Sequence, residues 1–319
     1  MSITKHALHN LAKAELHCHL GGAFDPAMLR TAVERGYRIP ITPEELEAAY
    51  PVVSYEDFVR WHTIARAVRA DFELMKLFFA LHIERLKAQN VVYAEIMIGT
   101  QGFEGRTEEF VERGRALRHL ADSVDGIEIG LVNSLNTSGS PEYAEELAEP
   151  LLRLHQAGVL SGVDWIGADL GYPLLPFRRT LNRLSEAGVG ITVHAGEWAG
   201  PESVREAMEH AHPSRIGHGV AIFKDPSLVS LFREQQIHLE LCPTSNVRSG
   251  VFERTEDHPL RMALDLGLNF SINSDDPGAF QCTIESEYRL AAEVFGFQEA
   301  DLMHATENAL RSRFPRASR

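Results

Sequence analysis

Two histidines flank one cysteine in His17-Cys18-His19, the pattern in this chain that most directly suggests chemistry. The three residues before it, Ala-Glu-Leu, are typical of a β-strand. Side chains on a strand alternate between its two faces, so we expect His17 and His19 to point the same way. Two imidazoles that converge from one strand supply half of a site for a first-row transition metal. A strand whose polar residues face solvent explains the short pattern equally well, and the choice rests on the other motifs.

A second motif, His-Ala-Gly-Glu at residues 194–197, follows the apolar run 190–193. His194 would supply a third nitrogen ligand. The small Ala-Gly pair permits a sharp turn, which can direct Glu197 back over the site to shuttle protons. The alternative is an acid that caps a helix before Pro201, and the neighbouring motifs favour the metal site.

Two more motifs carry a lone histidine and a pair of aspartates. His218 lies between two glycines, which favours a residue whose backbone must approach a ligand over a packed core histidine. Asp275 and Asp276 follow the run 269–274 and project in different directions, so one can bind metal while the other faces a substrate. Two neighbouring carboxylates are costly unless a cation or hydrogen-bond donors neutralise them. A solvated Asp-Asp-Pro turn is the alternative.

Taken together, the motifs offer three imidazoles and one carboxylate, with a glutamate, a histidine and an aspartate to spare. Three or four such ligands with an open position are typical of a catalytic zinc site, not of a closed structural one. A metal of this kind lowers the pKa of bound water toward ~7 and supplies hydroxide at neutral pH. The residues therefore predict metal-assisted hydrolysis.

Eight short runs rich in β-branched residues alternate with amphipathic segments, and these are the elements that must position the motifs. The runs are 14–20, 91–98, 127–135, 163–170, 190–194, 215–219, 238–242 and 269–274, and the amphipathic segments include 71–89, 107–124, 141–157 and 174–187. Eight alternations favour a closed α/β (β/α)8 TIM barrel over an open doubly wound sheet. We expect one domain, residues 1–319, with a helical insertion at residues 25–79 over the barrel mouth.

Chemistry in such a barrel lies at the carboxyl ends of the strands. Four of the 15 histidines fall at these ends: His17, His19, His194 and His218. Five others lie in helical patterns, and we assign them surface or structural roles: His62, His82, His119, His155 and His304.

The composition narrows the function further. Hydrophobic residues make up 44% of the 319-residue chain and charged residues 24%, as in an ordinary globular enzyme. The formal net charge of −14 disfavours nucleic acid and polyanionic substrates. Three cysteines imply no disulfide framework, and no run approaches the ~18 apolar residues of a membrane span. We expect a cytoplasmic protein with a small-molecule partner, and the oligomeric state is left open.

With these residues in view, the chain resembles the adenosine/adenine deaminase family of the metal-dependent amidohydrolase superfamily. The matching stretches occur in the order of the family: 14–23, 167–170, 194–197, 215–219, 240–246 and 274–277. The resemblance implies a zinc-bearing (β/α)8 barrel with one Zn²⁺ per chain. Its ligands would be His17, His19, His194 and Asp275.

The resemblance also implies roles for the remaining residues. Glu197 would give a proton to purine N1, His218 would orient and polarise the zinc-bound water, and Asp276 would hydrogen-bond purine N7. Ser245 matches a serine that lies near the metal in the family. Hydroxide attack at C6 of a 6-aminopurine would release ammonia and leave a 6-oxopurine. The chain lacks the Cys-x-x-Cys of cytidine-deaminase-type enzymes, and residues 162–170 lack the lysine that usually bridges two metals.

Three departures from the family pattern affect the substrate. Gly21 replaces the acid that usually follows His-x-His-Leu, Gly171 follows a shortened segment, and Met97-Ile98-Gly99-Thr100 lacks the usual Arg-Tyr-Ser-Pro type of sequence. In the family, these positions contact the sugar of the substrate or the group that replaces it. The residues that we expect to face the substrate are His19, Gly21, Gly171 and Asp276. Adenosine, deaminated to inosine, is the default substrate. Adenine or a modified or N6-substituted adenine nucleoside is the alternative, and a non-catalytic purine-binding protein is a remote one.

Overall fold

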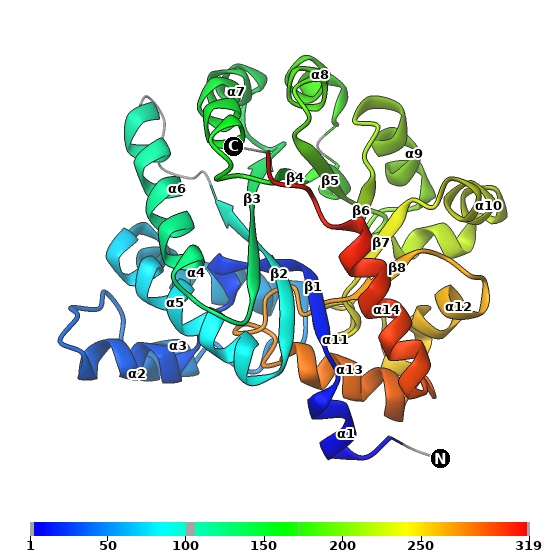
Figure 1. The fold of residues 1–319 in the computed structure, drawn as a ribbon, viewed down its shortest axis with the longest axis horizontal. Coiled ribbons are helices and arrows are strands. Elements are labelled where there is room, and N and C mark those ends of the chain that lie inside the picture. Colours follow the sequence, from blue (N-terminus) through cyan, green and yellow to red (C-terminus); the bar gives the residue numbers. More distant parts are fainter. Residues whose placement is uncertain (1–2, 100–105, 172, 318–319) are drawn as a thin grey trace.

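The strands form a single eight-stranded sheet in the computed structural model, which describes residues 3–99, 106–171 and 173–317 (Figure 1). The strand order is β1 to β8, and every neighbouring pair is parallel. The strands are β1 (Lys13–His19), β2 (Val91–Gly99), β3 (Glu128–Asn136), β4 (Gly162–Ile166), β5 (Gly190–Ala195), β6 (Arg215–His218), β7 (His238–Leu241) and β8 (Phe270–Ile272). Each lies on a run expected from the sequence, although β4 ends at Ile166 and a short 3-10 turn follows it.

The first and last strands meet through the residues that carry the chemistry. A parallel bridge joins Cys18 to Asp275. The amide of His19 donates to the carbonyl of Asp275 at 2.8 Å, and the amide of Asp275 donates to the carbonyl of His17 at 3.0 Å. Below this bridge, the side chain of Asn273 accepts the amide of Leu16 at 2.9 Å. The sheet therefore closes into the (β/α)8 TIM barrel that the sequence predicts.

Helices surround the barrel and connect its strands (Figure 1). Those outside the first connection are α1 (Lys5–Asn10), α6 (Thr107–Asp122), α7 (Pro141–Gln156), α8 (Arg178–Glu186), α9 (Pro201–His210), α10 (Pro226–Gln235), α11 (Pro243–Arg248), α12 (Leu260–Asp265), α13 (Ile284–Glu293) and α14 (Glu299–Ser312). Helix α7 illustrates why these segments are helical, since Ala144, Leu147, Leu151 and Leu154 recur every three or four residues on its buried face.

The connection between β1 and β2 is longer and contains four helices. They are α2 (Pro26–Glu34), α3 (Pro43–Glu47), α4 (Tyr55–Ala70) and α5 (Phe72–Ala88). These helices share a hydrophobic cluster of their own, in which the rings of Phe24 and Phe78 stack 5.2 Å apart and Trp61 is buried. Helix α5 also packs against β2 and α6 as part of the outer ring. The range 25–79 expected as an insertion therefore holds α2–α4 and the first part of α5.

The amino end of the barrel is closed by the C-terminal segment that crosses it after α14 (Figure 1). Phe314 is buried against the first residues of two strands, where a Cβ on Gly162 or Gly190 would come within 2.3 or 2.2 Å of its ring. The guanidinium carbon of Arg215 lies 3.5 Å from the centre of the same ring. This end of the barrel is packed shut, which leaves the carboxyl end for chemistry.

Within the described residues, the structure contains no helix both long and apolar enough to cross a membrane.

Candidate active site at the carboxyl end of the barrel

Four side chains from three strand ends converge at the carboxyl end of the barrel. The ligand-type atoms of His17, His19, His194 and Asp275 all lie within 4.8 Å of one another. Nε2 of His19 lies 3.3 Å from Nε2 of His194, and Nε2 of His17 and of His19 are each 3.5 Å from Oδ1 of Asp275. Nε2 of His17 is buried without a hydrogen-bond partner among the described residues. Three imidazole nitrogens and one carboxylate oxygen fit a divalent metal such as zinc.

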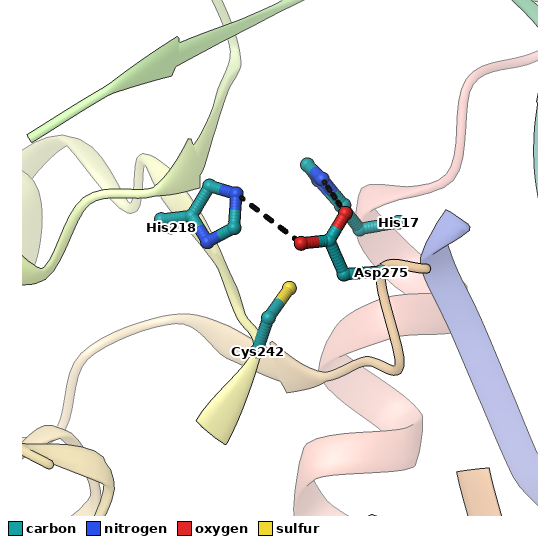
Figure 2. Close-up of side chains that lie close together, drawn as sticks. All are labelled: His17, His218, Cys242 and Asp275. Carbon is teal, nitrogen blue, oxygen red and sulfur yellow. Dashed lines mark ion pairs between the residues drawn. The ribbon is translucent and has the colours of Figure 1, made fainter. Parts of the chain in front are cut away.

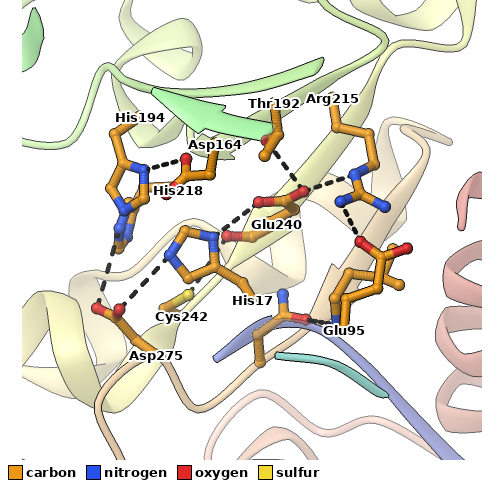
Figure 3. Close-up of polar contacts among 12 residues, drawn as sticks. His17, Glu95, Asp164, Thr192, His194, Arg215, His218, Glu240, Cys242 and Asp275 are labelled. Carbon is orange, nitrogen blue, oxygen red and sulfur yellow. Dashed lines mark hydrogen bonds and ion pairs between the residues drawn. The ribbon is translucent and has the colours of Figure 1, made fainter. Parts of the chain in front are cut away.

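Carboxylates hold two of these imidazoles from behind (Figure 3). Nδ1 of His17 lies 2.7 Å from Oε2 of Glu240, and Nδ1 of His194 lies 2.8 Å from Oδ1 of Asp164. An imidazole that donates Nδ1–H to a carboxylate presents its Nε2 lone pair on the other side. The two carboxylates thus fix the tautomer and the direction of both histidines. Neither carboxylate was expected to have a role from the sequence patterns, although both lie in runs that were expected to be strands.

Glu240 is itself kept ionised by a buried arginine from the neighbouring strand β6 (Figure 3). Nε of Arg215 lies 2.7 Å from Oε1 of Glu240, and its guanidinium also pairs with Glu95. Burial raises the pKa of Glu240, but Arg215 and His17 outweigh it and bring the pKa down to about 2. Glu240 therefore keeps a fixed negative charge beside Nδ1 of His17, on the side of the ring away from the other candidate metal ligands.

A second group of donors overlaps the first. His218 and Cys242 lie with His17 and Asp275 at similar mutual distances (Figure 2). A thiolate is the metal-binding form of cysteine, whereas burial, followed by the charge of Asp275, raises the pKa of Cys242 well above its ordinary value. His19 keeps 17% of its side chain exposed, which leaves the first group open to a ligand. The group with His19 and His194 is therefore the better metal site.

Asp169 organises the loop that carries Glu197. Its carboxylate accepts the amide of Gly196 at 2.7 Å, the amide of Ala199 at 2.9 Å and the hydroxyl of Ser203 at 2.6 Å. Burial, and then the charges of Asp275 and Asp169, raise the pKa of Glu197 well above its ordinary value. This raised pKa favours the protonated carboxyl group, which is the form that a general acid requires.

A chain of hydrogen bonds fixes the protonation of His218. The amide of Leu260 can only donate, so Nδ1 of His258, 3.2 Å away, accepts and Nε2 carries the proton. That Nε2 lies 3.2 Å from Oδ1 of Asn246, whose Nδ2 then donates to Nδ1 of His218 at 3.1 Å. His218 thus carries its proton on Nε2, 3.6 Å from Oε2 of Glu197 and 3.9 Å from Oδ2 of Asp275. Burial lowers the pKa of His218 well below its ordinary value, so the ring is neutral.

The backbone around the cluster is shaped by glycines and by two left-handed residues. A Cβ on Gly217 would lie 3.0 Å from Cε1 of His17 and 3.3 Å from Nδ1 of His194, so this glycine makes room for two imidazoles. A Cβ on Gly22 would lie 1.6 Å from Oδ1 of Asp276. His218 and Asp275 have φ values of 59° and 63°, a conformation that residues with a Cβ adopt mainly where function requires it.

Of the other residues expected in the site, Ser245 contacts the cluster and Gly171 does not. Oγ of Ser245 donates to Oδ2 of Asp275 at 2.6 Å, which leaves Oδ1 of that aspartate facing the three imidazoles. Gly171 is exposed, with a φ of 90°, and no described contact joins it to the cluster. Thr100 lies outside the described residues.

Asp276 faces helix α4. Oδ1 of Asp276 and Nε2 of His62 lie 3.8 Å apart, and each is buried without a hydrogen-bond partner among the described residues. Burial, and then Asp275, raise the pKa of Asp276 well above its ordinary value. At the other end of α4, the ring of Tyr55 meets the ring of Trp198 edge to face at 5.0 Å. The sequence pattern had assigned His62 a surface or structural role, because its helical setting gives no sign that α4 lies over the site.

Comparisons with known proteins agree with this architecture. A model of the family described as adenosine deaminase matches residues 12–319. The adenine deaminase of Sinorhizobium fredii is 32% identical over 315 residues, which cover 96% of this chain and 94% of that protein. The crystal structure of an adenine deaminase from Arthrobacter aurescens has a TM-score of 0.83 at 29% identity and covers 95% of this chain and 94% of that one. A zinc-bound amidohydrolase from Burkholderia ambifaria shares the fold, with a TM-score of 0.85 at 24% identity and coverage of 99% and 90%.

Proposed function

Because the chain belongs to the adenosine deaminase family and is a hydrolytic purine deaminase, we propose that it removes the 6-amino group of a 6-aminopurine. Water replaces the amine at C6, ammonia leaves, and a 6-oxopurine remains. The observation that carries this proposal is the convergence of His17, His19, His194 and Asp275 near the carboxyl group of Glu197, whose pKa is raised. A metal cluster with an adjacent general acid is what hydrolytic removal of an amine requires.

We assign one zinc ion to His17, His19, His194 and Asp275. The donor set, the partnerless Nε2 of His17 and the carboxylates behind two of the imidazoles support this assignment. The zinc in the amidohydrolase from Burkholderia ambifaria, which shares the fold, agrees with it. When bound, zinc supplies a Lewis acid that lowers the pKa of water toward ~7.

The side chains around the cluster donate protons and hydrogen bonds to different atoms of the substrate. Glu197 donates its proton to purine N1, which draws electrons from C6 and makes that carbon easier to attack. Asp276, whose pKa is also raised, donates a hydrogen bond to purine N7 from the other side of C6. His218 cannot act as a base through Nε2, because that nitrogen already carries the proton set by Asn246; it holds the attacking oxygen by donating a hydrogen bond. Ser245 keeps Asp275 in place.

Different observations support two candidate substrates, adenine and adenosine. The names of the relatives favour adenine, whereas the resemblance of the metal and proton-transfer residues to adenosine deaminases makes adenosine the default. Loss of the 6-aminopurine absorbance with release of ammonia, measured on zinc-loaded protein with adenine and adenosine in parallel, separates the two. Absence of turnover with both, and with a panel of N6-substituted and 5′-substituted adenosines, would contradict the proposed function.

A further inference from the structure

The space beside Gly21 is occupied by a side chain from α4. A Cβ placed on Gly21 would meet Cδ of Arg69 at 3.0 Å and its Nη1 at 3.8 Å. The stem of this arginine therefore lies against the bare backbone directly after His19 and Leu20. Any larger residue at position 21 would compete with Arg69 for the same space. Arg69 can occupy this space because residue 21 has no side chain.

Arg69 forms no ion pair in the part of the chain that the structure describes, although Asp276 lies near enough for its charge to oppose the lowering of the pKa of Arg69 by burial. Among the described residues its guanidinium hydrogen-bonds only with His62: Nη2 donates to the carbonyl at 2.9 Å, and Nη1 donates to Nδ1 of the ring. It forms no ion pair within the described ranges, in contrast to Arg30 and Arg60 of the same insertion, and it is partly buried, whereas the equally unpaired Arg66 is exposed. An acid at position 21 would have neutralised Arg69, and glycine leaves the charge open.

The contact with Arg69 also fixes which ring nitrogen of His62 carries the proton. A guanidinium has no acceptor, so Nδ1 of His62 accepts and Nε2 carries the proton. Nε2 lies 3.8 Å from Oδ1 of Asp276 and has no other described partner. Burial, and then the charge of Arg69, lower the pKa of His62 to about 3, so the ring is neutral. An N–H donor and a cation thus stand side by side at one end of the mouth.

The proposed reaction determines which part of a substrate reaches this end. C6 must lie at the metal cluster and N1 at Glu197, beside Trp198 and the start of α4. The five-membered ring of the purine then lies on the opposite side of C6, toward Asp276 and His62. A substituent on N9 extends from that ring toward Gly21 and the last turns of α4, where Arg69 lies.

We propose that Arg69 and His62 bind an anionic group, a phosphate or a carboxylate, carried by the N9 substituent of the substrate. This proposal rests on the proposed deamination of a 6-aminopurine and specifies its substrate class. Arginine donates paired hydrogen bonds that match the oxygens of either anion, and an acid at position 21 would have repelled them. The net charge of −14 does not oppose a single anionic group, because the open cation lies at the mouth itself.

The test compares kcat/KM for adenosine, adenosine 5′-monophosphate and adenosine 5′-carboxylate with zinc-loaded protein. We expect one or both anionic substrates to exceed adenosine by roughly 10- to 100-fold at low salt, and the advantage to shrink as salt screens the charge. A preference for the phosphate or for the carboxylate identifies the anion. Equal or better turnover of adenosine would overturn the proposal and leave the deaminase function intact, whereas no turnover of any 6-aminopurine would contradict that function.

Three substitutions sharpen the test. Arg69→Met keeps the stem beside Gly21 and removes the charge, so the ratio of anionic to neutral turnover should fall roughly 10- to 100-fold. Gly21→Asp should lower the same ratio with Arg69 unchanged, because the new carboxylate neutralises it. The matched control is Arg66→Met, which removes a charge from an exposed position of α4 and should leave the ratio as it is. An unchanged ratio in Arg69→Met would contradict the proposal.

A binding measurement separates recognition from turnover. Calorimetry with the 6-oxopurine products should show that zinc-loaded protein binds inosine 5′-monophosphate at least ~10-fold more tightly than inosine, and that Arg69→Met removes most of this difference. Equal binding of the two products by the unaltered protein would count against the proposal even if deamination is observed.

Discussion

The barrel floor and the α4 wall face each other across the site and are held in place by different means. The floor consists of His17, His19, His194, Asp275 and the residues behind them; the wall consists of Tyr55, His62 and Arg69. On the floor, three of the four donors have a second hydrogen bond to a residue on another strand or loop. On the wall, the described hydrogen bonds of His62 and Arg69 join only these two residues to each other. This difference agrees with the proposal that the barrel fixes the chemistry, while the insertion selects the substrate.

The largest effect is expected on the floor, from Glu197→Gln. The amide cannot give up a proton at N1, so turnover should fall by ~10²–10⁴-fold while zinc and purine still bind. The unaltered enzyme should lose kcat/KM as pH rises through the raised pKa of Glu197, because the protonated acid is the active form. Steady-state kinetics across pH, with metal analysis of the variant, tests both statements. Near-normal turnover would assign the N1 proton to another group.

The next effect concerns the tautomer of His218. Asn246→Asp replaces the donor at Nδ1 of His218 by an acceptor, which favours a proton on Nδ1 and removes it from Nε2. We expect kcat to fall by roughly 10²-fold with zinc content unchanged. Unchanged kcat in a correctly folded variant would show that the proton on Nε2 has no part in the reaction.

Asp164→Asn tests the carboxylates behind the floor. The amide can still accept the hydrogen bond of His194 but no longer offers a charge, so zinc should bind about 10- to 100-fold more weakly. Competition with a chelator measures this affinity, and Asp265→Asn on the surface helix α12 is the control. If both variants bind zinc equally well, Asp164 only packs against the imidazole.

The smallest effect is expected on the wall. Tyr55→Leu removes the edge-to-face contact with Trp198, an interaction of about 0.5–1.5 kcal/mol. Amide exchange in α4 should accelerate, by up to roughly 10-fold, while the strands keep their protection. Equal acceleration of amide exchange in β1 and β5 would show that the wall and the floor open together, and it would contradict the difference between these two regions.

The same division explains what the sequence could predict. Strand ends carry the motifs of the floor within a few residues, so the barrel, the donor cluster and the position of Glu197 follow from local patterns. Glu240 and Asp164 were missed because a buried carboxylate at a strand end has no spacing signature that points to a histidine on another strand. Gly217 was understood as allowing approach to a ligand, whereas it makes room for the rings of His17 and His194.

The wall shows where sequence patterns are least informative. Arg69 lies 48 positions after Gly21 in the chain, yet its side chain fills the space that the glycine leaves. Helical periodicity places His62 and Arg69 on a helix but does not say what that helix faces. Only the packing of α2–α5 around Phe24, Trp61 and Phe78 brings this face over the barrel.

The central claim is that His17, His19, His194 and Asp275 bind one zinc ion, and anomalous diffraction at the zinc absorption edge tests it most directly. Crystals of zinc-loaded protein should give a single peak about 2.0–2.2 Å from the three imidazole nitrogens and the aspartate oxygen. A peak bounded instead by His17, His218, Cys242 and Asp275, or no peak at this end of the barrel, would contradict the account.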